Sequence, residues 1–281
     1  MSETISDIVR SFYEQYPFPG YDDIDTPSTL IARARRGIFA QLLDDQIPFG
    51  ARVLDVGCGT GQLSNFLALG GRQVVGIDLS RNSLEKAREF QKRFNIPGVT
   101  FVQGDLFSAE LPDANFDFVL CNGVLHHTAD AEGGFARLCR WMKPQGYVVV
   151  GLYNTFGRLL FRLWRTAARS RNSAVAALDR TLQRRDLGEN RKSMWFADQY
   201  RHPHETSHTV EEVLRWFREN QVVFLNGIPK IAFGDPFTSH EQLFQPHPIG
   251  SRLEHALRQL GWMVTQRREG GFFVLIGKKG S

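Results

Sequence analysis

Short apolar runs alternate with amphipathic stretches through residues 51–154. The apolar runs predict buried strands, at Arg52–Val56, Gln73–Asp78, Val99–Val102, Phe116–Cys121 and Tyr147–Leu152. Helical periodicity separates these strands, over about 62–69, 80–94 and 132–141. Strands that alternate with helices form a parallel sheet through right-handed crossovers. The pattern therefore predicts an α/β fold with a doubly wound, mostly parallel sheet whose core is residues 51–154.

Residues 1–50 precede this core and predict an N-terminal helical lid. Helical periodicity covers 4–16 and 28–45, and two prolines with a glycine end the first of these helices. Four aromatic side chains lie close together there, at Tyr13, Tyr16, Phe18 and Tyr21. They suit the wall of a small-molecule pocket, although a helix packed on the edge of the sheet would account for them equally well.

A glycine-rich turn, Gly57–Gly61, follows the first strand. Glycines permit positive φ and let a ligand approach the backbone, while the helix behind the turn offers unpaired N–H groups to an anion. The spacing G-x-G-x-G matches neither the G-x-G-x-x-G dinucleotide fingerprint nor a P-loop. Asp78 ends the next strand, where a carboxylate can accept hydrogen bonds from both ribose hydroxyls of an adenosine ligand. Together these features predict a nucleotide-type pocket at the carboxyl ends of the strands.

Three motifs in order, Asp55–Gly61, Gly76–Ser80 and Gly104–Leu106, resemble those of the class I S-adenosylmethionine-dependent methyltransferases, in their UbiE/UbiG-like small-molecule branch. The resemblance is strong over 51–154 and returns over 251–279. It implies a Rossmann-like sheet and S-adenosyl-L-methionine as the cofactor. The cofactor-binding residues that it implies are Tyr16, Asp55, Gly57, Cys58, Gly59, Gly61, Asp78, Leu79, Asp105, Leu106, Asn122 and Gly123. Asp105 would lie beside the adenine amino group, although a capping carboxylate is the alternative role for this residue.

Two histidines follow the fourth strand at the rim where an open α/β sheet places its chemistry. A general base must remove a proton from the acceptor where the attacking atom carries one, and the ordinary histidine pKa suits that task at neutral pH. We therefore expect His126 and His127 to be catalytic candidates, with a capping or packing role as the alternative for either one. Tyr153 leaves the fifth strand on the same rim and is a third candidate, positioned to orient the acceptor.

The C-terminal segment predicts a helix over Ser251–Leu260 and then a hairpin of two strands, Trp262–Gln266 and Gly271–Ile276. By the resemblance this hairpin supplies the last two strands of the sheet, one of them antiparallel. Residues 251–281 then return to the core, and 155–250 form a largely helical cap insertion over the acceptor pocket. A rival for the same unit is a helix over Thr209–Asn220 followed by a strand at Val222–Leu225.

Four arginines, Arg158, Arg162, Arg165 and Arg169, are spaced 4, 3 and 4 residues apart, so they line one face of a helix. Three interpretations stay open, namely a solvated face, a weak contact with a membrane surface and a grip on an acidic acceptor. A cluster of potential metal ligands comprises His202, His204, Glu205 and His208. Pro203 interrupts this cluster and a capping box follows it, so we predict no metal site.

Whole-chain composition narrows the function classes. The 34 basic and 30 acidic residues give a net charge of +4, too mild for a typical nucleic-acid partner. The three cysteines show no disulfide framework and no zinc spacing. With no signal-like start and no long apolar run, the sequence favours the cytoplasm.

The sequence thus predicts a methyltransferase that acts on a small molecule, with O-, N- or C-methylation left open. Two alternatives remain, a non-catalytic protein that binds the cofactor and an enzyme whose acceptor is a protein or is linked to a lipid. A nicotinamide-dependent oxidoreductase is disfavoured because the glycine spacing does not match its fingerprint.

Overall fold

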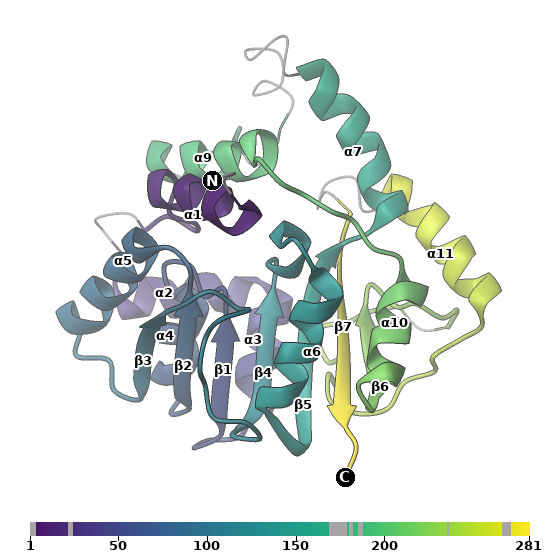
Figure 1. Cartoon of the computed structure of the whole chain (residues 1–281), viewed down its shortest axis with the longest axis horizontal. Helices are drawn as coiled ribbons and strands as arrows, with labels where there is room; N and C mark the ends of the chain where they lie inside the picture. Colours follow the sequence, from purple (N-terminus) through teal and green to yellow (C-terminus); the bar gives the residue numbers. More distant parts are fainter. Residues whose placement is uncertain are drawn as a thin grey trace.

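The computed structural model describes residues 4–21, 25–168, 179, 182–184, 188–234, 236–265 and 271–281. Its centre is a seven-stranded sheet in the order β3-β2-β1-β4-β5-β7-β6 (Figure 1). The strands are β1 (Arg52–Val56), β2 (Gln73–Asp78), β3 (Val99–Gln103), β4 (Phe116–Asn122), β5 (Met142–Tyr153), β6 (Val222–Ile228) and β7 (Phe272–Lys279). The first five are parallel, and β7 is antiparallel to both β5 and β6. The predicted Rossmann-like, mostly parallel sheet with a C-terminal antiparallel pair is confirmed.

Helices cover both faces of the sheet because each turns an apolar side inward. One face carries α3 (Ile38–Gln46), α4 (Gln62–Leu69) and α5 (Arg81–Arg93), and the other carries α6 (Ala131–Trp141) and α10 (Val210–Glu219). Their apolar side chains form two buried clusters, one on each side of the sheet. No helix in the described residues is long and apolar enough to span a bilayer.

The end of the chain differs from the prediction at the penultimate strand. Trp262–Thr265 is not a strand but the last part of helix α11 (Arg252–Thr265), and the expected turn at 267–270 lies outside the described residues. Helical structure prevails because His255, Gln259 and Trp262 recur at helical spacing and are all buried. The prediction mistook a short apolar run for an extended one.

The neighbour of β7 is β6, the unit that the sequence offered as the rival. Residues 210–228, assigned by the sequence to the cap insertion, thus form α10 and an edge strand of the sheet. The capping box that begins α10 at Thr209 is present as predicted. Among the described residues, the helical elements that remain for a cap are α7 (Thr155–Ala168), α9 (Glu189–Phe196) and the π-helical turn η2 (Ala197–Arg201).

The N-terminal residues form α1 (Ile5–Gln15) and α2 (Pro27–Arg36), and Gly37 separates α2 from α3 where the sequence predicted one continuous helix. Helix α1 lies beside α9 above the carboxyl ends of β1, β2 and β4 (Figure 1). It is held there by the start of α5, because the Tyr13 carbonyl accepts from Ser80 Oγ at 3.2 Å. Two chain segments far apart in sequence therefore cover the edge of the sheet where a site is expected.

Candidate active site

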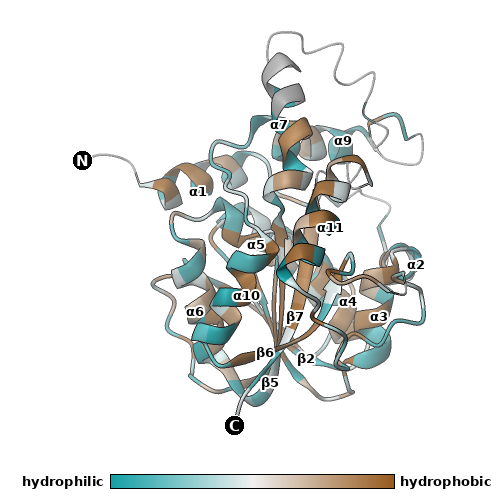
Figure 2. Cartoon of the chain, turned by 90° about the vertical axis from the view of Figure 1, so that its right-hand side faces the viewer, coloured by the Kyte–Doolittle hydropathy of each residue, from teal (hydrophilic) through white to brown (hydrophobic). Residues whose placement is uncertain are grey.

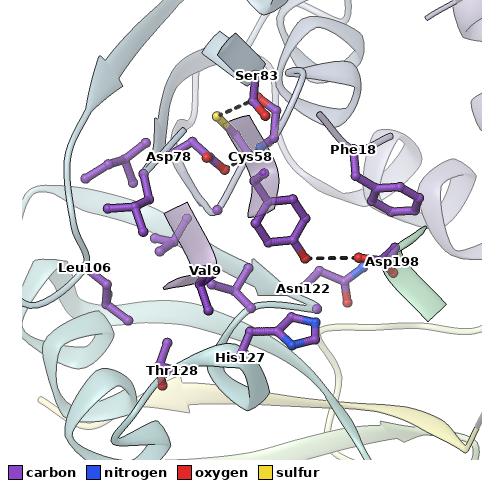
Figure 3. A pocket seen from close by; sticks show the side chains of 18 of the residues that line it. Val9, Phe18, Cys58, Asp78, Ser83, Leu106, Asn122, His127, Thr128 and Asp198 are labelled. Atoms are coloured by element: carbon purple, nitrogen blue, oxygen red, sulfur yellow. Dashed lines mark hydrogen bonds between the residues drawn. The ribbon is translucent and has the colours of Figure 1, made fainter. Parts of the chain in front are cut away.

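A cavity of about 720 Å³ lies at this edge, between the carboxyl ends of the strands and the elements α1 and η2 (Figure 3). Its walls include thirteen of the fifteen predicted site residues, namely His126, His127, Tyr153, Asp55, Gly57, Cys58, Gly59, Asp78, Leu79, Asp105, Leu106, Asn122 and Gly123. Tyr16 and Gly61 are the two that do not line it. Many of these residues lie together because β1, β2 and β4 are parallel and end at the same edge of the sheet.

The glycine turn serves both the cavity and the packing of the fold. Gly59 has φ +54°, and a Cβ added there would overlap the carbonyl oxygen of Phe18, so the lid segment lies directly on the turn. Gly61 has φ +73°, and an added Cβ would come within 2.7 Å of both Ala87 and the Phe101 ring. Gly61 is therefore needed for close packing of α4 against its neighbours, which corrects its predicted place in the cofactor site.

Tyr13 occupies the position that the sequence gave to Tyr16. Ser6, Val9 and Tyr13 share one face of α1 and line the cavity, in keeping with their spacing of 3 and 4 residues. Tyr16 is the C-terminal cap of the helix and its ring packs on Phe12, 5.3 Å between centroids. Tyr13 and Phe18 of the predicted aromatic segment therefore line the cavity, whereas Tyr16 does not.

Two carboxylates face the cavity from the ends of β1 and β2, the buried Asp55 and the half-buried Asp78. Asp78 accepts from the backbone N–H groups of Gly59 and Ser80, each at 2.8 Å. Asp55 accepts from Ser64 Oγ at 2.5 Å. Burial raises the pKa of Asp78 and raises that of Asp55 to about 6. Each carboxylate retains lone pairs, so both are suited to a ligand that brings hydroxyl donors or a positive charge.

Asp105 and its neighbours close the cavity beyond β3. The Asp105 carboxylate accepts from the backbone N–H of Phe107 at 2.7 Å, so the capping role left open by the sequence is realised. The residue also lines the cavity together with Leu106, which is 8% exposed, and Leu79. This arrangement offers an apolar slot with one carboxylate at its edge.

His127 and His126 form a 3-10 turn, η1 (Leu125–His127), just past β4. His127 Nδ1 lies 2.9 Å from the carbonyl oxygen of His204. A carbonyl can only accept, so Nδ1 carries the proton and Nε2 carries the lone pair. Burial lowers the pKa of His127, and it lowers that of His126 further. Both rings are therefore neutral at pH 7, as a base must be before it accepts a proton.

The rim also contains a hydrogen-bonded chain that the sequence did not reveal. Tyr13 OH donates to Asp198 Oδ1 at 3.0 Å, and Gln199 Nε2 donates both to Asp198 Oδ2 at 3.0 Å and to Tyr153 OH at 2.9 Å. Asp198 lies across from His127 on the cavity wall (Figure 3). The only local signal was an adjacent acid and amide within the otherwise apolar stretch 194–200.

The arginine face of α7 turns partly into the protein rather than outward. Arg158 is fully buried and donates to both oxygens of Glu205, at 3.0 and 2.8 Å, while Arg165 donates to Glu205 at 3.2 Å. The Arg158 guanidinium also lies 3.7 Å from the centre of the Tyr153 ring. Arg162 is exposed, and Arg169 lies outside the described residues. Of the three interpretations left open for this face, the solvated one does not apply to Arg158 and Arg165, because both are buried and paired with Glu205. The membrane-surface and acidic-acceptor contacts stay predictions.

Replacing Arg158 with leucine should lower the free energy of unfolding by about 3–5 kcal/mol, because it leaves Glu205 buried without its main counter-charge. Urea unfolding followed by circular dichroism measures the change. Replacing both Arg158 and Glu205 with leucine should recover only part of the loss, because Arg165 also donates to Glu205 and would then lose this partner. Arg81→Leu is the matched control, since Arg81 forms an exposed ion pair with Glu85 and should lose at most about 1 kcal/mol. Equal losses for the two single variants would contradict a buried pair.

The four residues of the possible metal cluster make other contacts. The His202 ring stacks on His127 with 3.6 Å between centroids, and His204 Nε2 lies 3.1 Å from the Thr128 carbonyl. His208 Nδ1 pairs with Glu212 at 3.0 Å, and Glu205 is engaged by arginines. This segment therefore holds the histidine rim in place.

A glycine turn, two carboxylates and two neutral histidines thus line one cavity at the carboxyl edge of a mostly parallel sheet, where folds of this kind bind nucleotide-type ligands. A family described as "Methyltransferase domain" matches residues 49–221. The chain therefore belongs to the S-adenosylmethionine-dependent methyltransferases, and S-adenosylmethionine is the cofactor of this family. The residues present fit that cofactor, since the cavity pairs an apolar slot with carboxylates suited to ribose hydroxyls and an ammonium group.

Individual proteins and a solved structure are similar to this chain. The chain is 28% identical to an uncharacterized protein of Synechococcus over 253 residues, 80% of this chain and 60% of that protein. It is 36% identical over 117 residues to a ubiquinone biosynthesis O-methyltransferase of Proteus mirabilis, 41% of this chain and 47% of that enzyme. The magnesium protoporphyrin IX methyltransferase of Synechocystis has the same fold, with a TM-score of 0.55 at 16% identity over 97% of this chain and 99% of that one. The chain thus spans about half to three-fifths of the two relatives matched by sequence.

Proposed function

We propose that the chain transfers a methyl group from S-adenosylmethionine to a hydroxyl oxygen of a small-molecule acceptor. The observation that carries the proposal is the fixed tautomer of His127, whose Nδ1 donates to the His204 carbonyl and leaves Nε2 basic. A hydroxyl group must lose its proton as its oxygen attacks a methyl group, and Nε2 is the group that takes it. The partial likeness to a ubiquinone biosynthesis O-methyltransferase supports oxygen as the atom methylated.

The cofactor would be held by the residues of the cavity wall. Asp78 accepts from the ribose hydroxyls, and Asp105 with Leu106 and Leu79 borders the adenine. The first turn of α4, at Gln62 and Leu63, would offer N–H groups to the methionine carboxylate, while Asp55 and Asn122 contact the ammonium. When bound, the cofactor supplies an already activated methyl group on a sulfonium.

The remaining wall residues would hold the acceptor and exclude water. Tyr153 and Gln199 are fixed in orientation by the chain that ends at Asp198 and Tyr13. Burial raises the pKa of Tyr153 to about 12, so its hydroxyl stays protonated and acts as a hydrogen-bonding group. Helix α1 and η2 close the cavity from above, and the exclusion of water strengthens polar contacts inside it.

Three buried free cysteines agree with the cytoplasm as the proposed location.

The volume of the cavity supports a small acceptor. Its volume of about 720 Å³ falls within the range of about 300–1,000 Å³ typical of small-molecule sites, and the cofactor must share it. A folded protein acceptor would have to reach Nε2 of His127 past both α1 and η2.

Transfer of tritiated methyl groups to a panel of phenols, enols and amines tests the proposal. We expect label in hydroxyl compounds, stable to the conditions that hydrolyse methyl esters, and none in the protein fraction of a lysate. Label confined to amines would contradict oxygen as the acceptor atom. Retention of cofactor with no transfer to any compound or lysate fraction would instead favour the non-catalytic alternative.

A further inference from the structure

Exposed apolar side chains concentrate on one side of the molecule. Twelve large apolar residues are exposed in the described part of the chain, and eight of them lie on α7, α11 or the loops that contact α11. The eight are Leu159, Leu160, Phe233, Ile249, Leu253, Leu257, Leu260 and Val264. Figure 2 looks onto this side, where α7 and α11 lie side by side. A concentration of this kind on a folded protein marks an interaction surface.

Helix α11 has its apolar side turned outward. His255, Gln259 and Trp262 face the protein, where the Gln259 side chain accepts from Asn154 Nδ2 at 2.7 Å and from the Val210 N–H at 2.9 Å. The opposite side presents Leu253, Leu257, Leu260 and Val264, which are between 48% and 76% exposed. Helices at a protein surface normally have the reverse arrangement. The outward side of α11 is therefore built to be covered.

The spacing of the four exposed residues identifies the kind of cover. Leu253, Leu257, Leu260 and Val264 are 4, 3 and 4 residues apart, the spacing of the seam between two paired helices. Ala256 and Gly261 lie beside the seam and are exposed, so a second helix can approach closely. An added Cβ at Gly261 would meet nothing within 4 Å. The outward side of α11 thus presents apolar side chains and leaves space for a second helix to pack against them.

We propose that α11 of one chain pairs with α11 of a second copy, antiparallel across a two-fold axis. An axis between Leu257 and Leu260 places Leu257 against Leu260 of the partner subunit and Leu253 against Val264 of the partner subunit. The seam is self-complementary, as a two-fold interface requires. The dimer buries the apolar face of both copies with one set of residues.

Charge favours a second copy over a lipid bilayer. Arg252 begins α11 with its side chain 88% exposed, and the last turn of the helix contains no basic residue. In the antiparallel pair Arg252 lies beside the partner's helix C-terminus, whose dipole attracts a cation. A helix that lies on a membrane carries basic residues along its polar side. In α11 that side is buried, and Arg258 points back to the Ala232 carbonyl and the Phe233 ring.

Sedimentation equilibrium of the full chain tests the dimer. We expect twice the mass of one chain for the wild type, and an apparent dissociation constant raised tenfold or more for Leu257→Glu combined with Leu260→Glu. Both side chains are about half exposed, so the variant should keep the circular dichroism spectrum of the wild type. Val223→Glu is the control, because Val223 is 62% exposed on the edge strand β6 and lies outside the seam. It should leave the mass unchanged.

Cysteine pairs test the direction of the two helices. Leu253→Cys protein mixed with Val264→Cys protein should form an interchain disulfide under mild oxidation, and Leu253→Cys alone should form none. The native cysteines are buried and do not interfere. A monomeric wild type would overturn the proposal, whether or not it sediments with vesicles of phosphatidylcholine and phosphatidylglycerol. Loss of the dimer in Val223→Glu alone would also overturn the proposal, because it would place the interface at the edge of the sheet.

Discussion

Replacing His127 with phenylalanine should lower kcat by roughly 10²-fold or more, the usual contribution of a general base. Phenylalanine keeps an aromatic ring beside His202 but has no nitrogen to accept a proton. The dissociation constant of S-adenosylhomocysteine should change little, because none of the proposed cofactor contacts uses His127. Turnover with labelled cofactor and calorimetric titration measure the two quantities separately.

His126→Phe is the matched control for this experiment. His126 packs between Tyr153 and His127, with ring centroids 4.1 and 4.2 Å away, and its Nδ1 is buried without a hydrogen-bond partner in the described structure. Its ring fills space, so phenylalanine should retain most of the turnover. Full turnover in the His127 variant, or a loss confined to the His126 variant, would remove His127 from the role of base.

The pH profile gives an independent check on the same base. Burial lowers the pKa of His127 from 6.5, so the neutral form that accepts a proton prevails at and above pH 6.5. We expect kcat to stay constant from pH 6.5 to 9 and to fall only at lower pH. The rate must be measured at saturating cofactor. Burial raises the pKa of Asp55 to about 6, so protonation of Asp55 in the free enzyme would add a second pH dependence to kcat/KM. A rate that rises steadily above pH 7 would indicate a different base.

Local sequence patterns were sufficient to locate most of the cavity wall. The glycine turn, Asp78 and the histidines each follow a strand, and parallel strands bring their carboxyl ends to one edge. Those residues could be placed once the strands were taken as parallel, which the alternating pattern predicted. Residues delivered by the cap could not be found in this way, because Asp198 and Gln199 reach Tyr13 and Tyr153 across long separations in sequence.

The directions of two helix faces could not be predicted from the sequence, for one physical reason. Periodicity shows which residues share a face but not which way that face points. On α7 the charged face turns inward, because the buried Glu205 engages Arg158 and Arg165. On α11 the polar face turns inward, because Gln259 bonds to Asn154, and the apolar face is left outside. In both cases buried polar partners, distant in sequence, fix the orientation of the helix.

Gly59→Val should abolish measurable binding of S-adenosylmethionine and S-adenosylhomocysteine. Gly59 has positive φ, its N–H donates to Asp78, and an added Cβ would overlap the Phe18 carbonyl. Valine would therefore push the lid segment off the turn and withdraw a donor from the carboxylate that binds the ribose. Calorimetric titration measures the loss, and faster proteolysis near Gly20 would report the displaced segment.

Gly50→Val separates this effect from backbone strain alone. Gly50 also has positive φ, at +76°, but an added Cβ meets nothing within 4 Å and the residue lies outside the cavity. Both variants should lose about 1–3 kcal/mol of stability from a side chain in the left-handed region. Only Gly59→Val should lose the cofactor, because only there does the side chain enter the space between the turn and the lid. Equal binding by the two variants would mean that Phe18 can move aside, and the lid would then not be seated on the glycine turn.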